Sequence, residues 1–336
     1  MAILVTGGTG YIGSHTVVEL IEQGFEVVIV DNLSNSKLEV LNRIKKITGK
    51  MPLFYQVDVC QANELEPIFV KHKISDVIHF AGLKAVGESV HKPLDYYKNN
   101  LNSTLTLLTL MIKHQVRNLV FSSSATVYGD VDHVPLTEQD KIGGTTNPYG
   151  TTKLMIEMIL HDVQKANPHM NIAILRYFNP IGSHRSGEIG EDPRGIPNNL
   201  MPYITQVAVG KLPLLHVYGN DYQTSDGTGV RDYVHVVDLA RGHVAAIKQL
   251  QQNPGVVTYN LGTGKGTSVL ELIHAFEQVN HVKIPYVIEP RRPGDIDQNY
   301  ASVTKAEKEM GWRAEFDIFD CCRDAWNWQV KNPQGL

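Results

Sequence analysis

The first half of the chain alternates short apolar runs with longer segments whose apolar residues recur at helical spacing. Several of the runs are continuously apolar, which is typical of strands that are covered on both faces. We predict strands at Ala2–Thr6, Glu26–Asp31, Leu53–Asp58, Asp76–Ala81, Asn118–Ser123 and Asn171–Tyr177. Between them we predict helices at Ile12–Gln23, Leu38–Thr48, Leu65–Lys71, Leu94–Lys113 and Tyr149–Lys165. This alternation predicts βαβ units and a Rossmann-like, doubly wound parallel sheet of the α/β class.

The pattern changes after about residue 180. The segment Pro180–Pro197 is rich in glycine, proline and charge and is predicted to be a long loop. Helices are expected beyond it at Asn199–Val209, Val237–Gln251 and Val269–Gln278. A length of 336 residues fits two domains at roughly 150 residues each. We therefore predict a first domain over residues 1–178 and a smaller C-terminal α/β domain mainly over 179–336, with the chain crossing back later.

Composition narrows the class of protein. A hydrophobic fraction of 42% and a charged fraction of 20% are those of a globular chain. The net charge of −4 argues against a nucleic-acid partner, because nucleic-acid surfaces are usually basic. We expect neither a membrane span nor a signal peptide. Cys60, Cys321 and Cys322 form no disulfide framework, so a reducing, cytoplasmic location is expected.

A glycine-rich turn follows the first predicted strand and opens the first predicted helix. Gly7, Gly10 and Gly13 are spaced to permit a tight turn and the approach of a pyrophosphate to the helix N-terminus. Asp31 ends the second strand, where a carboxylate accepts hydrogen bonds from the adenosine ribose and repels a 2′-phosphate. These features predict an NAD site. Asp58 could contact the adenine edge or could be a solvated turn residue.

A second group of residues predicts proton transfer. Tyr149 and Lys153 are four residues apart on a predicted helix and therefore share one face. Ser124 follows a predicted parallel strand, at the sheet edge where doubly wound folds bind ligands. A tyrosine has a pKa near 10, and a neighbouring ammonium and a nicotinamide cation both favour its phenolate form. The expected roles are a base for Tyr149, an electrostatic partner for Lys153 and a hydrogen-bonding group for Ser124.

These motifs resemble those of the extended short-chain dehydrogenase/reductases, and more closely the UDP-glucose (UDP-galactose) 4-epimerase family. The resemblance runs along nearly the whole chain. It rests on GGTGYIGSH from Gly7, DNLSNS from Asp31, HFAGLKAVGESV from His79, SSSATVYG from Ser122, NPYGTTK from Asn147, LRYFNPIG from Leu175, GIPNNLMPYI from Gly195, GTGVRDYVHV from Gly227 and RRPGD from Arg291.

The resemblance implies a reversible 4-epimerisation of UDP-hexoses with tightly held NAD. Tyr149 takes the proton of the sugar 4-hydroxyl while hydride moves to NAD, and the transient 4-keto sugar turns and receives hydride on its other face. The implied NAD site comprises Gly7, Gly10, Tyr11, Ile12, Gly13, Asp31, Asn32, Leu33, Ser34, Asn35, Ser36, Asp58, Val59, Phe80, Ala81, Gly82, Leu83, Lys84, Asn99, Ser124, Tyr149, Lys153 and Phe178. The family also pairs the helix Leu94–Lys113 and the helix from Tyr149 across a homodimer interface.

The substrate end needs groups for two phosphates, a ribose and a uracil. Arg231 and Arg292 are phosphate candidates because arginine suits bidentate phosphate contacts, and Asp295 is placed for ribose hydroxyls. By resemblance, the substrate residues also include Ser124, Tyr149, Asn179, Asn199, Leu200, His216, Val217, Tyr218 and Asn299. A bulky aromatic residue at the position of Asn299 restricts the sugar 2-substituent in this family. We therefore expect that N-acetylated UDP-hexoses are accepted as well.

Other functions are weighed on the same residues. Dehydratases that resemble this family carry an Asp-Glu pair where Ala125 and Thr126 stand, and uronate decarboxylases commonly place Glu at position 126. A dehydrogenase acting on another nucleotide sugar remains open and would need exchangeable cofactor. A non-catalytic dinucleotide sensor also remains open, although Ser124, Tyr149 and Lys153 are all retained. Histidines and cysteines show no metal-ligand spacing, so no metal is expected.

Overall fold

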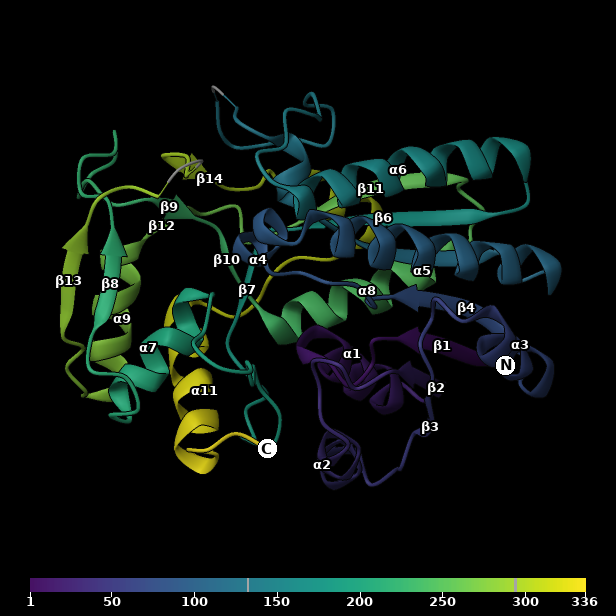
Figure 1. Cartoon of the computed structure of the whole chain (residues 1–336), viewed down its shortest axis with the longest axis horizontal. Coiled ribbons are helices and arrows are strands. Elements are labelled where there is room, and N and C mark those ends of the chain that lie inside the picture. The colour runs from purple at the N-terminus through teal and green to yellow at the C-terminus, as the bar shows by residue number, and fades with distance from the viewer. Residues whose placement is uncertain (132, 293–294) are drawn as a thin grey trace.

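The larger half of the molecule is built on a seven-stranded sheet whose strands are all parallel (Figure 1). The computed structural model describes residues 1–131, 133–292 and 295–336. The strand order is β11-β6-β5-β4-β1-β2-β3, which confirms the predicted Rossmann-like fold. The strands are β1 (Ala2–Thr6), β2 (Glu26–Asp31), β3 (Leu53–Gln56), β4 (Ile74–His79), β5 (Asn118–Ser124), β6 (Asn171–Tyr177) and β11 (Val256–Leu261).

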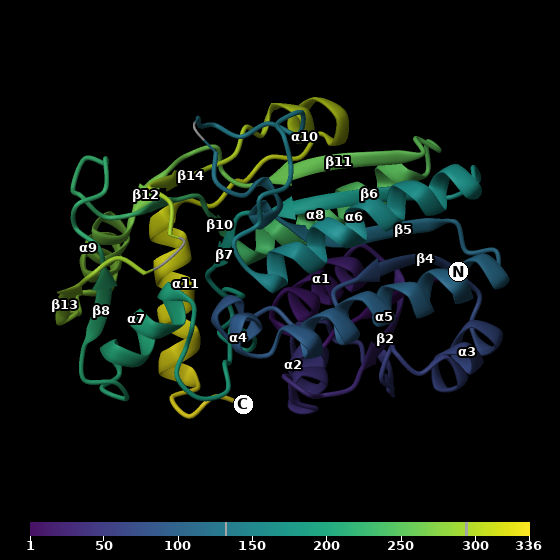
Figure 2. The same cartoon turned by 45° about the horizontal axis from the view of Figure 1, so that its top comes forward.

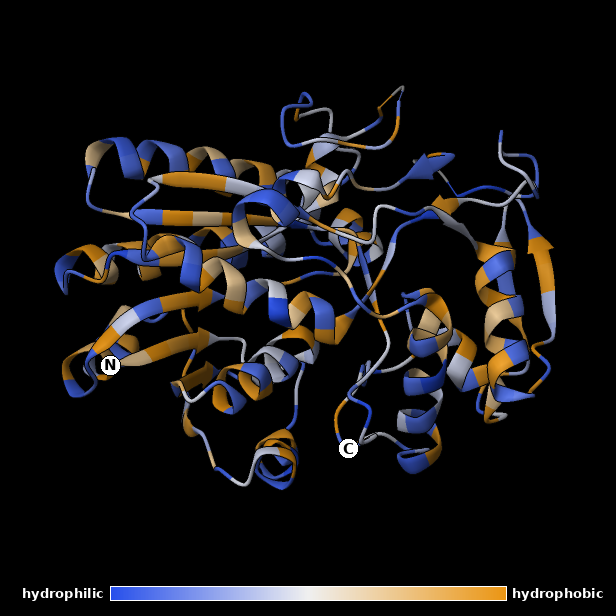
Figure 3. Cartoon of the chain, turned by 180° about the vertical axis from the view of Figure 1, so that it is seen from behind, coloured by the Kyte–Doolittle hydropathy of each residue, from blue (hydrophilic) through white to orange (hydrophobic). Residues whose placement is uncertain are grey.

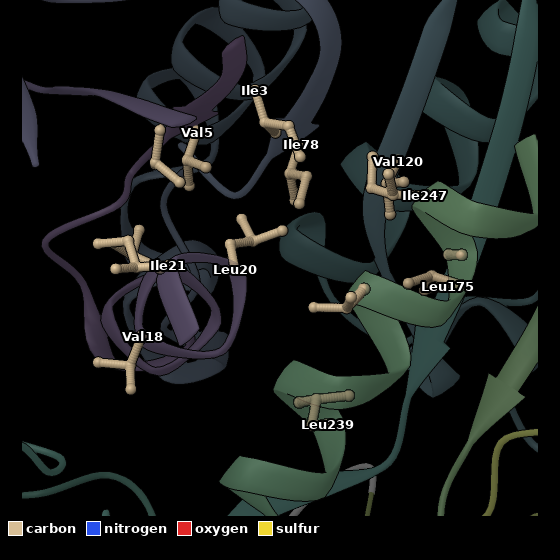
Figure 4. Packing of buried hydrophobic residues seen from close by; sticks show 14 of the residues in the cluster. Ile3, Val5, Val18, Leu20, Ile21, Ile78, Val120, Leu175, Leu239 and Ile247 are labelled. Atoms are coloured by element: carbon tan, nitrogen blue, oxygen red, sulfur yellow. The ribbon is translucent and has the colours of Figure 1, made fainter. Parts of the chain in front are cut away.

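Both faces of this sheet are covered, which explains the continuously apolar strands. Ile3 and Val5 of β1 share an apolar cluster with residues of α1 (Tyr11–Glu22), α2 (Glu39–Thr48) and α8 (Val236–Leu250). Figure 4 shows the members of this cluster from β1, α1 and α8. Leu4, between them, packs with α3 (Ala62–Lys71), α5 (Pro93–Lys113) and α6 (Pro148–Ala166). Because side chains alternate along a strand, a two-faced core requires apolar residues at consecutive positions. Figure 3 shows apolar residues along these strands.

The smaller half packs three helices around its own apolar core. They are α7 (Leu200–Ala208), α9 (Val269–Asn280) and α11 (Ile318–Lys331). Beside them lie a pair of strands, β8 (Leu215–Tyr218) with β13 (Tyr286–Glu289), and a small sheet of β12 (Thr267–Ser268), β9 (Val230–Arg231) and β14 (Gln298–Asn299). The parallel pair β7 (Asn179–Ile181) and β10 (Tyr233–His235) lies between the two halves (Figures 1 and 2).

The structure differs from the sequence prediction mainly after residue 178. α8 and β11 return to the larger sheet, where β11 forms the edge strand beside β6. β3 ends at Gln56 rather than Asp58, because Asp58 begins a turn in which its carboxylate accepts the Cys60 N–H. The strands β7 to β14 and the helices α4 (Val86–His91), α10 (Thr304–Met310) and α11 were not predicted. Among the described residues, no helix combines the length and apolar character needed to cross a membrane.

Candidate active site

The glycine-rich turn between β1 and α1 has room only for glycine at two of its positions. Gly7 has φ +71°, and a Cβ on it would lie 2.8 Å from the amide nitrogen of Ala81. A Cβ on Gly13 would overlap the carbonyl oxygen of Gly7. The N-cap of α1 is Gly10, which has no side chain to cap the first N–H groups. These donors and the helix dipole suit an anion such as a pyrophosphate.

Asp31 at the end of β2 joins this turn to the loop that follows. One carboxylate oxygen accepts hydrogen bonds from the Leu33 N–H (2.9 Å) and the Ser36 hydroxyl (3.1 Å), and the other accepts from the Thr9 N–H (3.2 Å). Leu33 has φ +59°, so the chain turns sharply around the carboxylate. Asn32 reaches Asp58 at 3.4 Å. The predicted residues 31–36 and 58 therefore lie together, beside the glycine turn.

The loop after β4 carries the predicted residues Phe80 to Lys84 and is held by a residue that the sequence analysis missed. The Asn100 amide on α5 accepts from the Leu83 N–H (2.8 Å) and donates to the Leu83 carbonyl (3.0 Å) and to Thr152 on α6 (3.0 Å). The neighbouring Asn99, which was predicted, donates to Asn100 at 3.0 Å. Asn100 is buried, so its position within the helix Leu94–Lys113 was the only available signal.

Other predicted cofactor residues lie deeper. Val59 and Phe178 are buried in apolar clusters. The ring of Phe80 lies 4.7 Å from that of His243. Tyr11 donates its hydroxyl to the Gly182 carbonyl at 2.6 Å, which links the start of α1 to the segment after β7.

Ser124, Tyr149 and Lys153 meet at the carboxyl end of β5. Ser124 ends the strand, and its hydroxyl oxygen accepts from the Thr126 N–H at 3.2 Å. Asn147 caps α6 by accepting the Gly150 N–H at 2.8 Å, which places Tyr149 in the first turn. The ammonium of Lys153 donates to the Ser122 carbonyl at 2.6 Å and lies 5.8 Å from the centre of the Tyr149 ring.

Burial favours the neutral form of both Tyr149 and Lys153. It raises the pKa of Tyr149 to about 12, against a hydrogen bond from Ser124 that lowers it. It lowers the pKa of Lys153 to about 8, against the nearby Glu157 carboxylate, which raises it. A phenolate at neutral pH therefore needs further positive charge beside Tyr149, which a bound nicotinamide cation provides.

The two candidate phosphate ligands converge in the smaller half. Arg231 on β9 lies opposite Asn299 on β14 in parallel register, and its guanidinium donates to the Ile296 carbonyl at 2.9 Å. Arg292 lies 4.9 Å from the centre of the Tyr218 ring and 3.0 Å from Asp295. Pro293 and Gly294 of the RRPGD motif lie outside the described residues.

Two tyrosines that the sequence analysis missed lie among these arginines. Burial raises the pKa of Tyr233 to about 12, and the charges of Arg231 and Arg292 both oppose this increase. The guanidinium of Arg291 lies 4.0 Å from the centre of the Tyr222 ring. Tyr233 lies in the motif GTGVRDYVHV, but nothing in that motif indicated its side-chain contacts, and residue 222 lies in a loop outside the quoted motifs.

Asp232, also missed, holds this region together. It is buried, and its carboxylate accepts from the backbone N–H groups of Thr263 (2.7 Å), Gly264 (3.0 Å) and Ala301 (3.1 Å). Asp232, which follows Arg231 in the chain, thus links β9 to the loop after β11 and to the segment after β14. Its place in GVRDYV was visible in the sequence, but its partners were not.

The remaining predicted substrate residues are placed differently from one another. Asn199 occupies the N-cap position of α7 just before Leu200, but its side-chain amide donates to Glu191 at 2.7 Å and makes no capping hydrogen bond. Lys84 of the cofactor loop pairs with the same carboxylate at 3.3 Å. Asn179 is exposed on β7. His216 pairs with Glu289 at 2.8 Å, whereas Val217 is 1% exposed in the core, so only its backbone can face a ligand. Within the described ranges, no cluster of His, Cys, Asp or Glu is arranged to hold a metal ion.

Comparisons with known proteins agree with this geometry. Residues 4–325 match the family model described as GDP-mannose 4,6 dehydratase. The chain is 58% identical to a UDP-glucose 4-epimerase of Pasteurella multocida over 335 residues, which is 100% of this chain and 99% of the relative. It superposes with a TM-score of 0.97 and 56% identity, over all of both chains, on a UDP-glucose 4-epimerase of Bifidobacterium longum crystallised with NAD+ and UDP.

A second solved structure carries a different sugar nucleotide. It is a UDP-glucose 4-epimerase of Stenotrophomonas maltophila with bound NAD and formylated UDP-arabinopyranose, with a TM-score of 0.97, 51% identity and 98% coverage of each chain. The similarity of both structures to this chain extends through the larger and the smaller half.

Proposed function

The chain belongs to the UDP-glucose 4-epimerase family within the extended short-chain dehydrogenase/reductases, and we propose that Ser124, Tyr149 and Lys153 are its catalytic residues. It is an NAD-dependent isomerase that interconverts UDP-glucose and UDP-galactose. The observation that carries the residue assignment is the meeting of these three side chains at the carboxyl end of β5, on the same sheet as the glycine turn.

The match to a dehydratase family model reflects the shared scaffold. Elimination of water in the dehydratases uses an Asp-Glu pair just after the active-site hydroxyl. This chain has Ala125 and Thr126 there, and the Thr126 hydroxyl donates to Ser124 at 3.0 Å. Neither residue can act as the acid or the base of an elimination, which favours epimerisation.

The residues around the glycine turn fit NAD. Gly7 and Gly13 permit the tight turn because a Cβ on either would meet backbone atoms, and this turn and Asp31 suit the pyrophosphate and the adenosine ribose. When bound, NAD supplies the reversible two-electron acceptor for carbon 4 of the sugar. We propose that residues 32–36, 58–59, 80–84, 99 and 178 complete the site. Residues 1–178 with α8 and β11 then form the NAD-binding domain, and the rest of 179–336 forms the nucleotide-sugar domain.

Proton transfer falls to the chain's own groups. Tyr149 as phenolate accepts the proton of the sugar 4-hydroxyl and returns it after the sugar has presented its other face. Ser124 holds the 4-oxygen by a hydrogen bond. The Lys153 ammonium stabilises the phenolate, and the Ser122 carbonyl fixes the ammonium in place. The hexose must turn within the site, so the binding energy must come from the nucleotide.

We propose that the smaller half holds that nucleotide. Arg231 and Arg292 suit the two phosphates, Tyr218 suits the uracil face and Asp295 suits ribose hydroxyls. Support comes from the approach of both guanidinium groups to Tyr233. Asn179, Asn199, Leu200 and the strand 216–217 complete the proposed lining.

The sugar specificity is proposed to include N-acetylated hexoses. Asn299 lies opposite Arg231 and carries a side chain much smaller than an aromatic one, which leaves room near the sugar 2-substituent. Asn299→Tyr should depress turnover of UDP-N-acetylgalactosamine selectively. Equal losses on UDP-galactose and its N-acetylated analogue would contradict this proposal.

We also propose a homodimer formed through α5 and α6. Large apolar side chains are exposed on these two packed helices: Leu94, Leu105, Ile112, Met155 and Met158. Sedimentation at micromolar concentration should show twice the chain mass, and a species of 37.4 kDa alone would contradict the dimer.

The cysteines at 60, 321 and 322 are free, which supports a reducing, cytoplasmic location.

The decisive experiment is an assay of the purified protein with UDP-galactose and no added NAD. Formation of an equilibrium mixture of the two 4-epimers, resolved by chromatography, is the expected result. Conversion that requires stoichiometric added NAD and yields an oxidised sugar would indicate the dehydrogenase. NAD binding with no conversion of either sugar would indicate the dinucleotide sensor.

A further inference from the structure

We propose that Glu157 is a positioning residue that keeps Lys153 in its ammonium form and so sets the alkaline limit of catalysis. The inference rests on the proposed function, because it assigns Glu157 a role in the activity of Tyr149 and Lys153. Glu157 lies one helical turn beyond Lys153 on α6, so the two side chains share a face. Glu157 is 1% exposed and Lys153 is 6% exposed.

The contacts of Glu157 fix its carboxylate behind the catalytic strand. One oxygen accepts the hydroxyl of Ser123, the residue before Ser124, at 2.5 Å. Arg176 on β6 donates to both oxygens, at 3.1 and 2.8 Å. The free nitrogen of Arg176 donates to the Tyr128 hydroxyl at 3.0 Å, which continues to Asn260 at 2.6 Å. Both carboxylate oxygens therefore accept hydrogen bonds, and two of the three donors belong to a guanidinium.

Few other charges face Lys153. The groups around it are Tyr149 and Glu157 on α6, Ser122 on β5, His79 on β4, and Arg176 and Tyr177 on β6. Burial lowers the pKa of His79 to about 3 and raises that of Tyr177 well above its usual value, so both are neutral at physiological pH. Arg176 is positive and is paired with Glu157 at 2.8 Å. Glu157 is thus the negative charge that offsets the burial of Lys153.

The size of the effect follows from Coulomb's law. For two charges about 6 Å apart, as is usual for side chains four residues apart on a helix, and an effective dielectric of about 20, losing the carboxylate charge shifts a pKa by about two units. Burial already lowers the pKa of Lys153 to about 8, so a further decrease leaves the amine largely neutral at neutral pH. Tyr149 then loses the cation that favours its phenolate. Glu157 would thereby affect catalysis without touching the substrate.

The test compares Glu157→Gln with Glu157→Asp in the full-length, NAD-containing enzyme. The first removes the charge at nearly constant shape, and the second keeps the charge on a shorter side chain. We expect the alkaline limb of kcat against pH to move down by about one pH unit or more in Glu157→Gln, with at least a tenfold loss on the alkaline side. We expect Glu157→Asp to keep the wild-type limb despite a lower turnover.

A second readout does not depend on turnover. The phenolate of Tyr149 is titrated by ultraviolet difference spectroscopy, with Tyr149→Phe in each background as the blank. The pKa of Tyr149 should rise in Glu157→Gln and stay near the wild-type value in Glu157→Asp. An inactive wild type would contradict the proposed function, whereas this titration would still judge the role of Glu157.

A folding control separates charge from structure. Glu157→Gln leaves Arg176 buried without its partner, so the double variant Glu157→Gln/Arg176→Gln is made alongside it. An unchanged alkaline limb in whichever of the two folds would overturn the proposal. Failure of both to fold would also overturn it, because Glu157 would then act as the structural partner of Arg176.

Discussion

The two halves of the molecule hold the charges that we propose for catalysis and substrate binding in opposite ways. In the larger half, Lys153 is buried against a backbone carbonyl and Asp31 accepts three hydrogen bonds from its own loop and turn. In the smaller half, Arg292 is 55% exposed and pairs with Asp295, three residues along the chain. On the proposed assignment, the larger half is organised for catalysis before a ligand arrives, whereas the smaller half exchanges an internal ion pair for phosphate contacts.

The largest effect is expected from Tyr149→Phe in the larger half. Removing the only proton-accepting group on the ring should lower kcat by about a thousandfold, the usual contribution of a positioned acid–base group. Bound NAD and the thermal unfolding temperature should stay near wild type, because the ring still packs. Turnover is measured with UDP-galactose by chromatography. A loss below about tenfold would remove Tyr149 from the base role.

A smaller effect, on stability and NAD binding, is expected from Gly13→Ala, because the new methyl group would overlap the Gly7 carbonyl oxygen. Backbone cannot move aside cheaply, so we expect a loss of about 1–3 kcal/mol in the free energy of unfolding and loss of co-purified NAD. The matched control is Gly87→Ala in α4, where a Cβ meets open space. That variant should keep its NAD and its stability, and equal behaviour of the two variants would contradict the close-approach argument.

In the smaller half, a substitution of Arg292 should change substrate affinity. Arg292→Ala removes a charged hydrogen-bond donor worth about 1.5–3 kcal/mol, so KM for UDP-galactose should rise by at least tenfold with kcat nearly unchanged. Arg323→Ala is the control, because Arg323 also pairs with an acid three residues away and is 56% exposed, but on α11. Parallel changes in both variants would show that the Arg292 effect is not local to the nucleotide.

At neutral pH the smallest effect is expected at His79 in the larger half, because its contribution to stability changes only in acid. Burial lowers the pKa of His79 in the folded chain to about 3, well below its ordinary value near 6.5. Between these values the unfolded chain binds more protons, so stability falls as pH decreases, by about 1.4 kcal/mol per pH unit for this residue.

His79→Gln tests this sign, because an amide can replace the hydrogen bonds to Thr6 (2.7 Å) and Thr104 (3.1 Å) without titrating. Denaturant unfolding between about pH 6 and pH 4 should show a flatter decrease in the variant than in the wild type. Parallel decreases would mean that His79 is not held neutral in the folded chain.

The comparison also explains how far the sequence could be interpreted. The runs at β1, β2 and β6 were predicted at their observed ends because a strand between two helical layers must be apolar at successive positions. Ser124, Tyr149 and Lys153 followed from the same regularity, since strand ends and helix faces are fixed by the fold.

The sequence of the smaller half predicted fewer of its elements and contacts. Strands of two to four residues, such as β9 and β10, are too short for periodicity to be visible. Asp232 and Asn100 act through partners distant in sequence, 69 and 52 residues away for Ala301 and Thr152, and no local pattern reveals such contacts. α11 carried a capping pair, Asp317 and Asp320, that could have revealed its start.

The late return of β11 to the sheet has a consequence for biosynthesis. β6 is flanked by β5 on one side and by β11 on the other, and β11 is completed only at Leu261. A nascent chain released or stalled before that residue exposes the free backbone edge of a buried, apolar strand, which is a template for intermolecular pairing. Truncated products that end between β6 and β11 should therefore aggregate. Only when β11 has been synthesised and has paired with β6 is this edge covered.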